Sequence, residues 1–170
     1  MEYSDTIRPL LISEKRLPSE VRRHTRALAA VLAEQVAPEL GEDRRVLFVF
    51  ILRGAMLLYV PFAERFEAAS FAFLSGDSLT PPNCRDYDTA VIVDTVVETG
   101  RTVTAAVELL SAAGISAKRR FCACVCANES SKEKLSRLFD RVFCLEYMEN
   151  VRVTIDAGQF AACGDDAQAE

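Results

Sequence analysis

Short apolar runs and helically spaced apolar residues follow one another along this chain. Runs that are rich in β-branched residues and too short for a helix predict buried strands; they lie at 46–52, 71–74, 90–93, 120–127 and 142–145. Apolar residues three or four positions apart predict amphipathic helices; these lie at 18–37, 56–66, 103–113 and 130–139. Strands that alternate with helices predict an α/β fold, with a parallel sheet covered by helices on both faces.

The segments outside this pattern predict the domain organisation. No repeat or linker divides the sequence, so we expect one domain over 1–170. Residues 1–17 form an N-terminal arm, and the polar stretch 75–88 is expected to be a flexible loop that closes as a lid. From 146 to 170 we expect a reduced hood and tail. Because ligands of parallel sheets bind at the carboxyl ends of strands, the loops after the strands should carry the function.

Composition and charge exclude several classes of protein. Apolar residues make up 50% of the chain and charged residues 26%, which is ordinary for a globular domain. The formal net charge of −5 argues against a general nucleic-acid binder. No apolar run approaches the roughly 20 residues that span a bilayer, and the first residues lack the pattern of a signal peptide. We therefore expect a cytoplasmic protein with no membrane partner.

Six cysteines leave two interpretations of the segment 122–126. Cys122, Cys124 and Cys126 could hold a soft metal ion. Zinc ligands, however, usually sit on turns with at least two residues between them. In a strand, residues two apart point to the same face. We therefore expect the three thiols to line one face of a buried strand as small apolar side chains.

The segment 90–102 carries the clearest chemistry. A short strand leads into Asp94 and Glu98, and the Thr-Gly-Arg-Thr sequence of 99–102 then precedes an amphipathic helix. Backbone N–H groups at the start of a helix point outward and carry partial positive charge, so this turn suits a phosphate. The two acids at the end of the strand suit ribose hydroxyls or a hydrated Mg²⁺.

This Asp-x₃-Glu-Thr-Gly-x-Thr pattern resembles the phosphoribosyl pyrophosphate (PRPP) signature of the type I phosphoribosyltransferases. The resemblance implies that Asp94 binds the ribose hydroxyls and that 98–102 wraps the 5′-phosphate. Glu98 stands where purine-using members place an acid near the base, and it could accept a proton. The Ile-Leu-Arg-Gly sequence of 51–54 resembles the pyrophosphate loop of the uracil phosphoribosyltransferases, in which Arg53 would neutralise the leaving group.

The resemblance extends to both ends of the chain. The segment 10–23 resembles the arm and first helix of that family, and Asp156-Ala157-Gly158 resembles a segment that contacts PRPP. The PRPP-binding residues implied are Arg53, Gly54, Asp94, Thr95, Glu98, Thr99, Gly100, Arg101, Thr102 and Asp156. The catalytic residues implied are Glu98, Asp94 and Arg53. The nucleobase would contact Ile155, Ala157 and Gly158, and Mg²⁺ would bind near Asp94 and Asp156.

The departures from the family pattern leave a second function open. Thr95 stands where most members carry a second acid, although the uracil enzymes also lack it. The loop after the second strand lacks an expected arginine, for which Arg85 could substitute; Arg85 is equally well a solvated charge. The family implies a homodimer that transfers phosphoribosyl from PRPP to a nucleobase, with uracil as the first candidate and Mg²⁺ as cofactor. The alternative is a degenerate homologue that binds PRPP or a nucleotide and regulates or scaffolds a partner.

Overall fold

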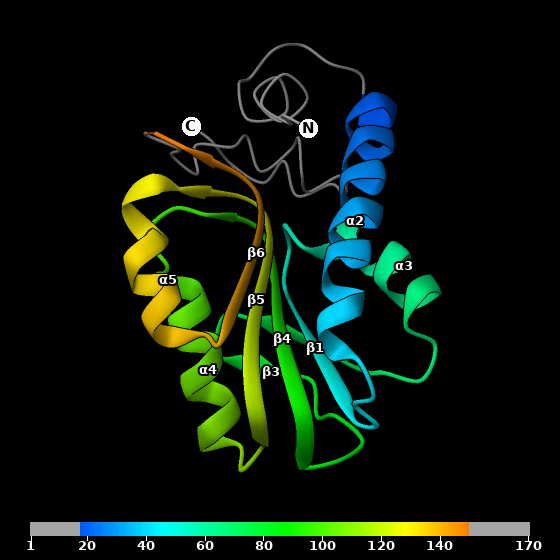
Figure 1. Ribbon diagram of the computed structural model, residues 1–170, viewed down its shortest axis with the longest axis vertical. Coiled ribbons are helices and arrows are strands. Elements are labelled where there is room, and N and C mark those ends of the chain that lie inside the picture. Colours follow the sequence, from blue (N-terminus) through cyan, green and yellow to red (C-terminus); the bar gives the residue numbers. More distant parts are fainter. Residues whose placement is uncertain (1–17, 150–170) are drawn as a thin grey trace.

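The computed structural model describes residues 18–149 (Figure 1). Its helices are α2 (Pro18–Leu40), α3 (Met56–Arg65), α4 (Arg101–Ala112) and α5 (Lys132–Leu138), and the 3-10 helix η1 (Glu129–Ser131) precedes α5. Its strands are β1 (Val46–Ile51), β2 (Ser70–Ser75), β3 (Ser78–Leu79), β4 (Asp86–Val97), β5 (Ser116–Asn128) and β6 (Arg141–Met148). The predicted arm at 1–17 lies outside the described residues, as does the hood from 150 onward.

The six strands form one sheet in the order β3-β2-β1-β4-β5-β6. All neighbouring pairs are parallel except β2 and β3, which are antiparallel. Figure 1 shows α2 and α3 on one face of this sheet, and α4 and α5 on the other. The predicted α/β fold with a parallel sheet is therefore confirmed.

Both faces of the sheet are buried, as the continuous apolar runs predict. In β1, Phe48 and Phe50 pack in the core beneath α2 and α3, where the Phe48 and Phe62 rings lie 5.3 Å apart. Leu47 and Val49 point the other way, into the core beneath α4 and α5. Every residue of β1 is buried, so this strand is fixed from both sides and holds the loop that follows it.

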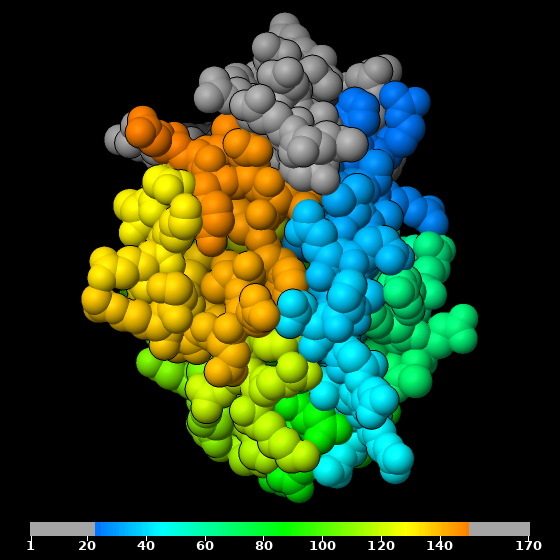
Figure 2. All heavy atoms as spheres, viewed as in Figure 1, coloured from blue at the N-terminus to red at the C-terminus, as the bar shows by residue number. Residues whose placement is uncertain are grey.

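Helix α2 also contacts the far side of the sheet. Figure 2 shows the β6 side chains, in orange, against those of α2, in blue to cyan. Arg141 at the start of β6 forms an ion pair with Glu39 of α2, with 3.4 Å between nitrogen and oxygen. Helix α2 therefore covers β5 and the β6 edge of the sheet.

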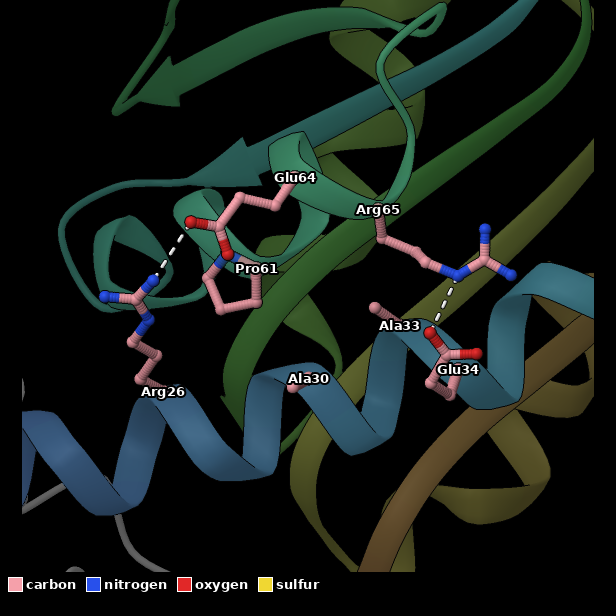
Figure 3. Close-up of a pocket in the computed structure, with 7 residues that line it drawn as sticks. All are labelled: Arg26, Ala30, Ala33, Glu34, Pro61, Glu64 and Arg65. Carbon is pink, nitrogen blue, oxygen red and sulfur yellow. Dashed lines mark hydrogen bonds and ion pairs between the residues drawn. The ribbon is translucent and has the colours of Figure 1, made fainter.

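Two ion pairs join α2 to α3 across a surface groove of about 270 Å³ (Figure 3). Arg26 reaches Glu64 at 3.0 Å, and Arg65 reaches Glu34 at 2.7 Å. The residues between the pairs are small or cyclic: Ala30, Ala33 and Pro61. All four charged side chains are exposed, and exposed pairs contribute about 0–1 kcal/mol each. Their effect is to fix the alignment of the two helices more than to stabilise the fold.

Three sequence predictions about element boundaries were wrong, and a fourth, the loop at 75–88, is described in the next paragraph. Strand β4 continues through Val97 because Val96 and Val97 are buried and pair with β5, so Asp94 lies inside the strand. The helix α2 contains Pro38 in its last turn and ends before Gly41, whose φ of 51° is left-handed. Residues 146–148, assigned to the hood and tail, belong to β6.

The segment 75–88 is not one continuous loop. It contains β3, which returns along β2, and the first residues of β4. Thr80 holds this return: its N–H donates to the Phe73 carbonyl at 2.9 Å, and its hydroxyl accepts the Phe73 N–H at 2.7 Å. Within it, only the turn at 76–77 and the stretch 80–85 lie outside the strands.

The strand cysteines are core residues, as predicted. Cys122 and Cys124 pack beneath α4 and α5, whereas Cys126 packs beneath α2 and α3. The prediction that all three thiols lie on one face of the strand is therefore right for Cys122 and Cys124 and wrong for Cys126. The alternation of faces is interrupted there, since Val125 and Cys126 both pack in the core beneath α2 and α3. Within residues 18–149 no group of three or more His, Cys, Asp or Glu side chains is arranged to hold a metal ion.

Candidate functional site

The sheet order creates a topological switch point between β1 and β4, and the space beyond the carboxyl ends of these strands is called the crevice below. These two strands are neighbours, but β1 continues to α3 on one face and β4 continues to α4 on the other. Ligands of open parallel sheets bind at such a switch point, at the carboxyl ends of the strands. The turn after β1 and the turn after β4 are the two segments that the sequence assigned to phosphate binding.

The turn after β1 is held closely by backbone hydrogen bonds. The N–H of Leu52 donates to the carbonyl of Leu74 at 2.7 Å, and the N–H of Ala55 donates to the carbonyl of Ile51 at 3.0 Å. The peptide bond between Leu52 and Arg53 is cis. The Arg53 side chain is exposed at this turn. A guanidinium fixed on a rigid turn is well suited to a phosphate oxygen pair.

Gly54 joins this turn to β4. A Cβ atom at position 54 would lie 2.7 Å from the Thr95 hydroxyl oxygen and 3.9 Å from a carboxyl oxygen of Asp94. Real Cβ contacts are not that short, so a glycine is required for the two segments to approach this closely. The structure thereby brings Arg53, Gly54, Asp94 and Thr95, which are forty residues apart in the sequence, into one place.

Asp94 is a half-buried carboxyl group whose environment changes its acidity. Desolvation raises the pKa of Asp94 to about 7, although hydrogen bonds from the backbone N–H groups of Thr95 and Val96 act in the opposite direction. The Thr95 N–H donates to this carboxyl at 2.7 Å. A bound cation or a hydroxyl donor would favour the ionised form of Asp94. The carboxyl group would therefore bind a ligand that supplies a cation or a hydroxyl group.

The turn after β4 begins helix α4 and has the shape of an anion site. Gly100 precedes the helix with a φ of 70°, a conformation that side-chain-bearing residues rarely adopt. The carbonyl of Gly100 accepts the N–H of Thr104 at 3.1 Å and its hydroxyl at 2.7 Å. The Arg101 N–H lies 3.4 Å from the Thr99 hydroxyl. Arg101 and its neighbour at 102 are exposed, so this helix start is open to solvent.

Helix α5 adds a residue that the sequence analysis missed. The Lys134 ammonium donates to the Thr99 carbonyl at 3.3 Å. Its Cδ and Cε would lie 3.4 and 3.7 Å from a Cβ at Gly100. The sequence did place a functional loop after the strand at 120–127, but helical spacing alone could not show which side chain of the next helix reaches back to 99–100.

Thr95 has an unusual environment. Its side chain is 2% exposed, and within residues 18–149 its hydroxyl has no hydrogen-bond partner. The hydroxyl faces Gly54 and occupies the space that a Cβ atom at position 54 would need. Buried hydroxyl groups without partners are rare, so this one is explained either by a ligand atom or by the close packing of the two turns.

Some predicted residues are not part of this arrangement. Arg85 lies at the amino end of β4, where its guanidinium donates to the Ala113 carbonyl at 3.2 Å; it cannot replace the arginine that the β2 loop lacks. The predicted contacts of Asp156 and of the nucleobase residues Ile155, Ala157 and Gly158 lie outside the described residues. Glu98 is half-buried beside the α4 turn.

Comparison with known families identifies this arrangement. The sequence model of the family described as the phosphoribosyl transferase domain matches residues 23–158. The chain belongs to this family. The match includes both turns and every site residue that the structure describes. A comparison with curated proteins found no match.

Solved structures share the fold of this phosphoribosyl transferase domain. The AQ2163 protein from Aquifex aeolicus is 14% identical, with a TM-score of 0.67 over 86% of this chain and 83% of its own. The orotate phosphoribosyltransferase from Aeropyrum pernix is 18% identical, with a TM-score of 0.55 over 71% and 70%. A hypoxanthine-guanine-xanthine phosphoribosyltransferase is 14% identical, with a TM-score of 0.55 over 80% of both chains. At these identities the likeness concerns the fold alone.

Two further findings bear on the phosphoribosyl transferase domain. No helix within residues 18–149 combines the length and the hydropathy needed to span a bilayer. For Mg²⁺, the described part of this site offers the carboxyl of Asp94, whereas the Thr95 hydroxyl is buried against Gly54. Mg²⁺ usually keeps several waters and binds through one or two carboxylates and the phosphates of its substrate. The described residues therefore fit an ion that arrives with a pyrophosphate better than a resident ion held by protein ligands.

Proposed function

We propose that this protein binds PRPP in the β1–β4 crevice and transfers its phosphoribosyl group to a nucleobase. The observation that carries the proposal is the contact of Gly54 with Thr95 and Asp94, because it joins the basic turn after β1 to a carboxyl group of β4, the strand that leads into the start of α4. In this proposal the turn, the carboxyl group and the helix start would receive the pyrophosphate, the ribose and the 5′-phosphate of one PRPP molecule. The membership of the chain in the phosphoribosyl transferase domain family supports the same ligand.

Each part of the crevice would have one task. The turn 98–102 would hold the 5′-phosphate through backbone N–H groups and the Thr99 and Thr102 hydroxyls, and Asp94 would accept hydrogen bonds from the ribose hydroxyls. A nitrogen of the base attacks C1 of the ribose, and the C1–oxygen bond breaks with its electron pair on pyrophosphate. Arg53 would stabilise the negative charge of the leaving group. Positioning of the reactants supplies much of the remaining rate.

Magnesium belongs to this proposal as a companion of PRPP. When bound, the ion would neutralise part of the pyrophosphate charge. Asp94 is the described residue that would approach it, and Asp156 is the second predicted ligand. The ionised form of Asp94 would be favoured by the ion, which fits a carboxyl whose pKa is raised by desolvation.

The base remains an inference from the sequence. We propose uracil, because the Ile-Leu-Arg-Gly turn and the absence of a second acid at 95 resemble the uracil enzymes. Glu98 would accept the proton that the base nitrogen loses. The similar structures act, by their names, on orotate and on hypoxanthine, guanine and xanthine, so their fold does not favour pyrimidines over purines.

A second function is favoured by specific observations. The segment from β2 to β3 contains no arginine, and Arg85 lies at the amino end of β4, where it donates to the Ala113 carbonyl; neither therefore supplies a guanidinium to the carboxyl ends of β1 and β4. Thr95 faces Gly54 and not an open site. A protein with fewer groups for the leaving pyrophosphate could bind PRPP or a nucleotide without turnover and act on a partner protein.

Calorimetry with PRPP and Mg²⁺, followed by a pyrophosphate-release assay over a panel of bases, separates these functions. Release with uracil supports the enzyme; tight binding without release for any base supports the binding protein; no binding refutes both. In the Gly100→Asp variant, an acid would be added to the proposed phosphate turn, against Lys134 and Leu135, and the left-handed backbone would be strained. We expect PRPP binding to be lost and the circular dichroism spectrum to be retained. Unchanged affinity would contradict our placement of the 5′-phosphate.

We also propose a homodimer in the cytoplasm, as the family resemblance suggests. Met56 and Val60 are large apolar side chains that are 47% and 44% exposed, one turn apart on α3. Helix α3 packs on α2, so this pair lies on the outer side of a two-helix layer. A second copy of the chain would cover this pair. Sedimentation velocity tests the dimer, and a monomer at all concentrations would contradict it.

A further inference from the structure

Lys134 is fixed in place by its neighbour on α5. Leu135 is fully buried in the core beneath α4 and α5, and its Cδ2 would lie 3.8 Å from a Cβ at Gly100. This anchor presents Lys134 to the turn before α4, where the alkyl chain covers Gly100 and the ammonium reaches the Thr99 carbonyl. A helix distant in sequence thus supplies a cation to the start of another helix.

The other lysines of the described chain have carboxylate partners. Lys118 pairs with Asp88 at 2.7 Å, and Lys132 pairs with Glu129 at 3.4 Å. Within residues 18–149, Lys134 has no carboxylate partner; its contact is the carbonyl of Thr99. An ammonium group has three N–H donors, so this carbonyl leaves donors for another acceptor. The side chain is exposed, and an incoming anion can therefore reach it.

The surroundings of the turn favour an anion as that acceptor. The first turn of α4 contains no acidic residue, and no side chain caps its N-terminus. The positive end of the α4 helix dipole and the positive charge of Lys134 therefore both favour an anion at this turn.

We propose that Lys134 is a binding residue for the phosphate that the 98–102 turn holds, donating to it from the side of α5 while it keeps its contact with Thr99. The inference rests on the proposed function, because PRPP is the ligand whose 5′-phosphate would occupy this turn. It adds a direct charge-assisted contact to the groups of the family signature, which all lie on β4 and α4.

The test compares Lys134→Met, which removes the charge and keeps the length, with Lys134→Arg, which keeps the charge. Lys132→Met is the matched control, since it removes a charge two residues away on the same helix. We expect Lys134→Met to weaken the binding of PRPP and of ribose 5-phosphate about tenfold, the usual size for a lost charge-assisted hydrogen bond. Lys134→Arg should retain most of the affinity, and Lys132→Met should match the wild type.

Pyrophosphate, which has no 5′-phosphate, separates a direct contact from a general disturbance of the site. Its affinity should be the same in Lys134→Met and in the wild type. Equal losses for pyrophosphate and ribose 5-phosphate, or no loss for either, would overturn the inference. A lower melting temperature with unchanged ribose 5-phosphate affinity would do so as well. If the wild type binds none of the three ligands, the proposed function fails; if it binds PRPP and Lys134→Met binds equally well, only the role of Lys134 fails.

Discussion

The raised pKa of Asp94 links the stability of this fold to pH. The carboxyl ionises near 3.8 in the unfolded chain and at about 7 in the folded protein. Between these values the unfolded chain has lost the proton and the folded protein still holds it. The free energy of unfolding therefore falls as the pH rises from about 4 to about 7, and the loss is complete above that range.

The size of this effect follows from the two pKa values. Their difference of about three units corresponds to about 4 kcal/mol for a group that is fully removed from water. Asp94 is only half-buried, and solvent screening reduces the cost, so we expect about 1–3 kcal/mol. The substitution Asp94→Asn removes the titration, keeps the size of the side chain, and leaves an oxygen that can accept the Thr95 N–H.

Urea unfolding of the ligand-free protein at pH 5 and pH 8 measures this difference. Relative to the wild type, Asp94→Asn should gain about 1–2 kcal/mol of stability between the two pH values, because pH 5 to 7 covers about two of the three pKa units. The exposed residue Asp77, in the turn after β2, provides the control Asp77→Asn, for which the difference from wild type should not change with pH. A difference for Asp94→Asn that is equal at both pH values would refute the reasoning.

Three further results are expected. At pH 6.5, PRPP binding should release protons as Asp94 ionises, which calorimetry in buffers of different ionisation enthalpy detects; zero release would contradict the raised pKa. Gly54→Ala should cost about 1–3 kcal/mol through its contact with the Thr95 hydroxyl, and the double variant with Thr95→Ala should recover most of it; additive effects would argue against that contact. Peptide-resolved alkylation should modify exposed Cys84 in the native protein and buried Cys124 only after unfolding. Neighbouring thiols and burial raise the pKa of the Cys124 thiol, which lowers its reactivity further. Early labelling of Cys124 would contradict its burial.

The sequence pattern predicted most of the fold, because its signals were local and repeated. Short β-branched runs and helical spacing located all the long elements, and the alternation of strands with helices implied a parallel sheet. The errors lie where tertiary contacts override a local signal. The polar segment 75–88 contains β3 because Thr80 bonds to Phe73, and β4 passes through Asp94 because β5 continues beside it.

For the candidate site, the sequence indicated two turns, and phosphate binding by them stays a prediction. A glycine after each of two strands located these turns, and the structure shows that the two strands are neighbours. The contribution of α5 could not be predicted, because nothing in the segment 132–138 shows that Lys134 reaches Gly100. The position of Arg85 could not be predicted either. The chain returns along β2 through β3, and this return brings Arg85 to the amino end of β4.

The fit between Gly54 and Thr95 also limits how this sequence could change. Restoring the acidic pair of its relatives by Thr95→Asp would bury a carboxylate against the Gly54 backbone, where the hydroxyl already has no partner among the described residues. An unpaired buried charge costs several kcal/mol. Thr95→Asp, which would make the sequence more like its family, would thus destabilise this fold unless position 54 and its turn changed first. Substitutions at 54 and 95 are therefore tolerated only in combination.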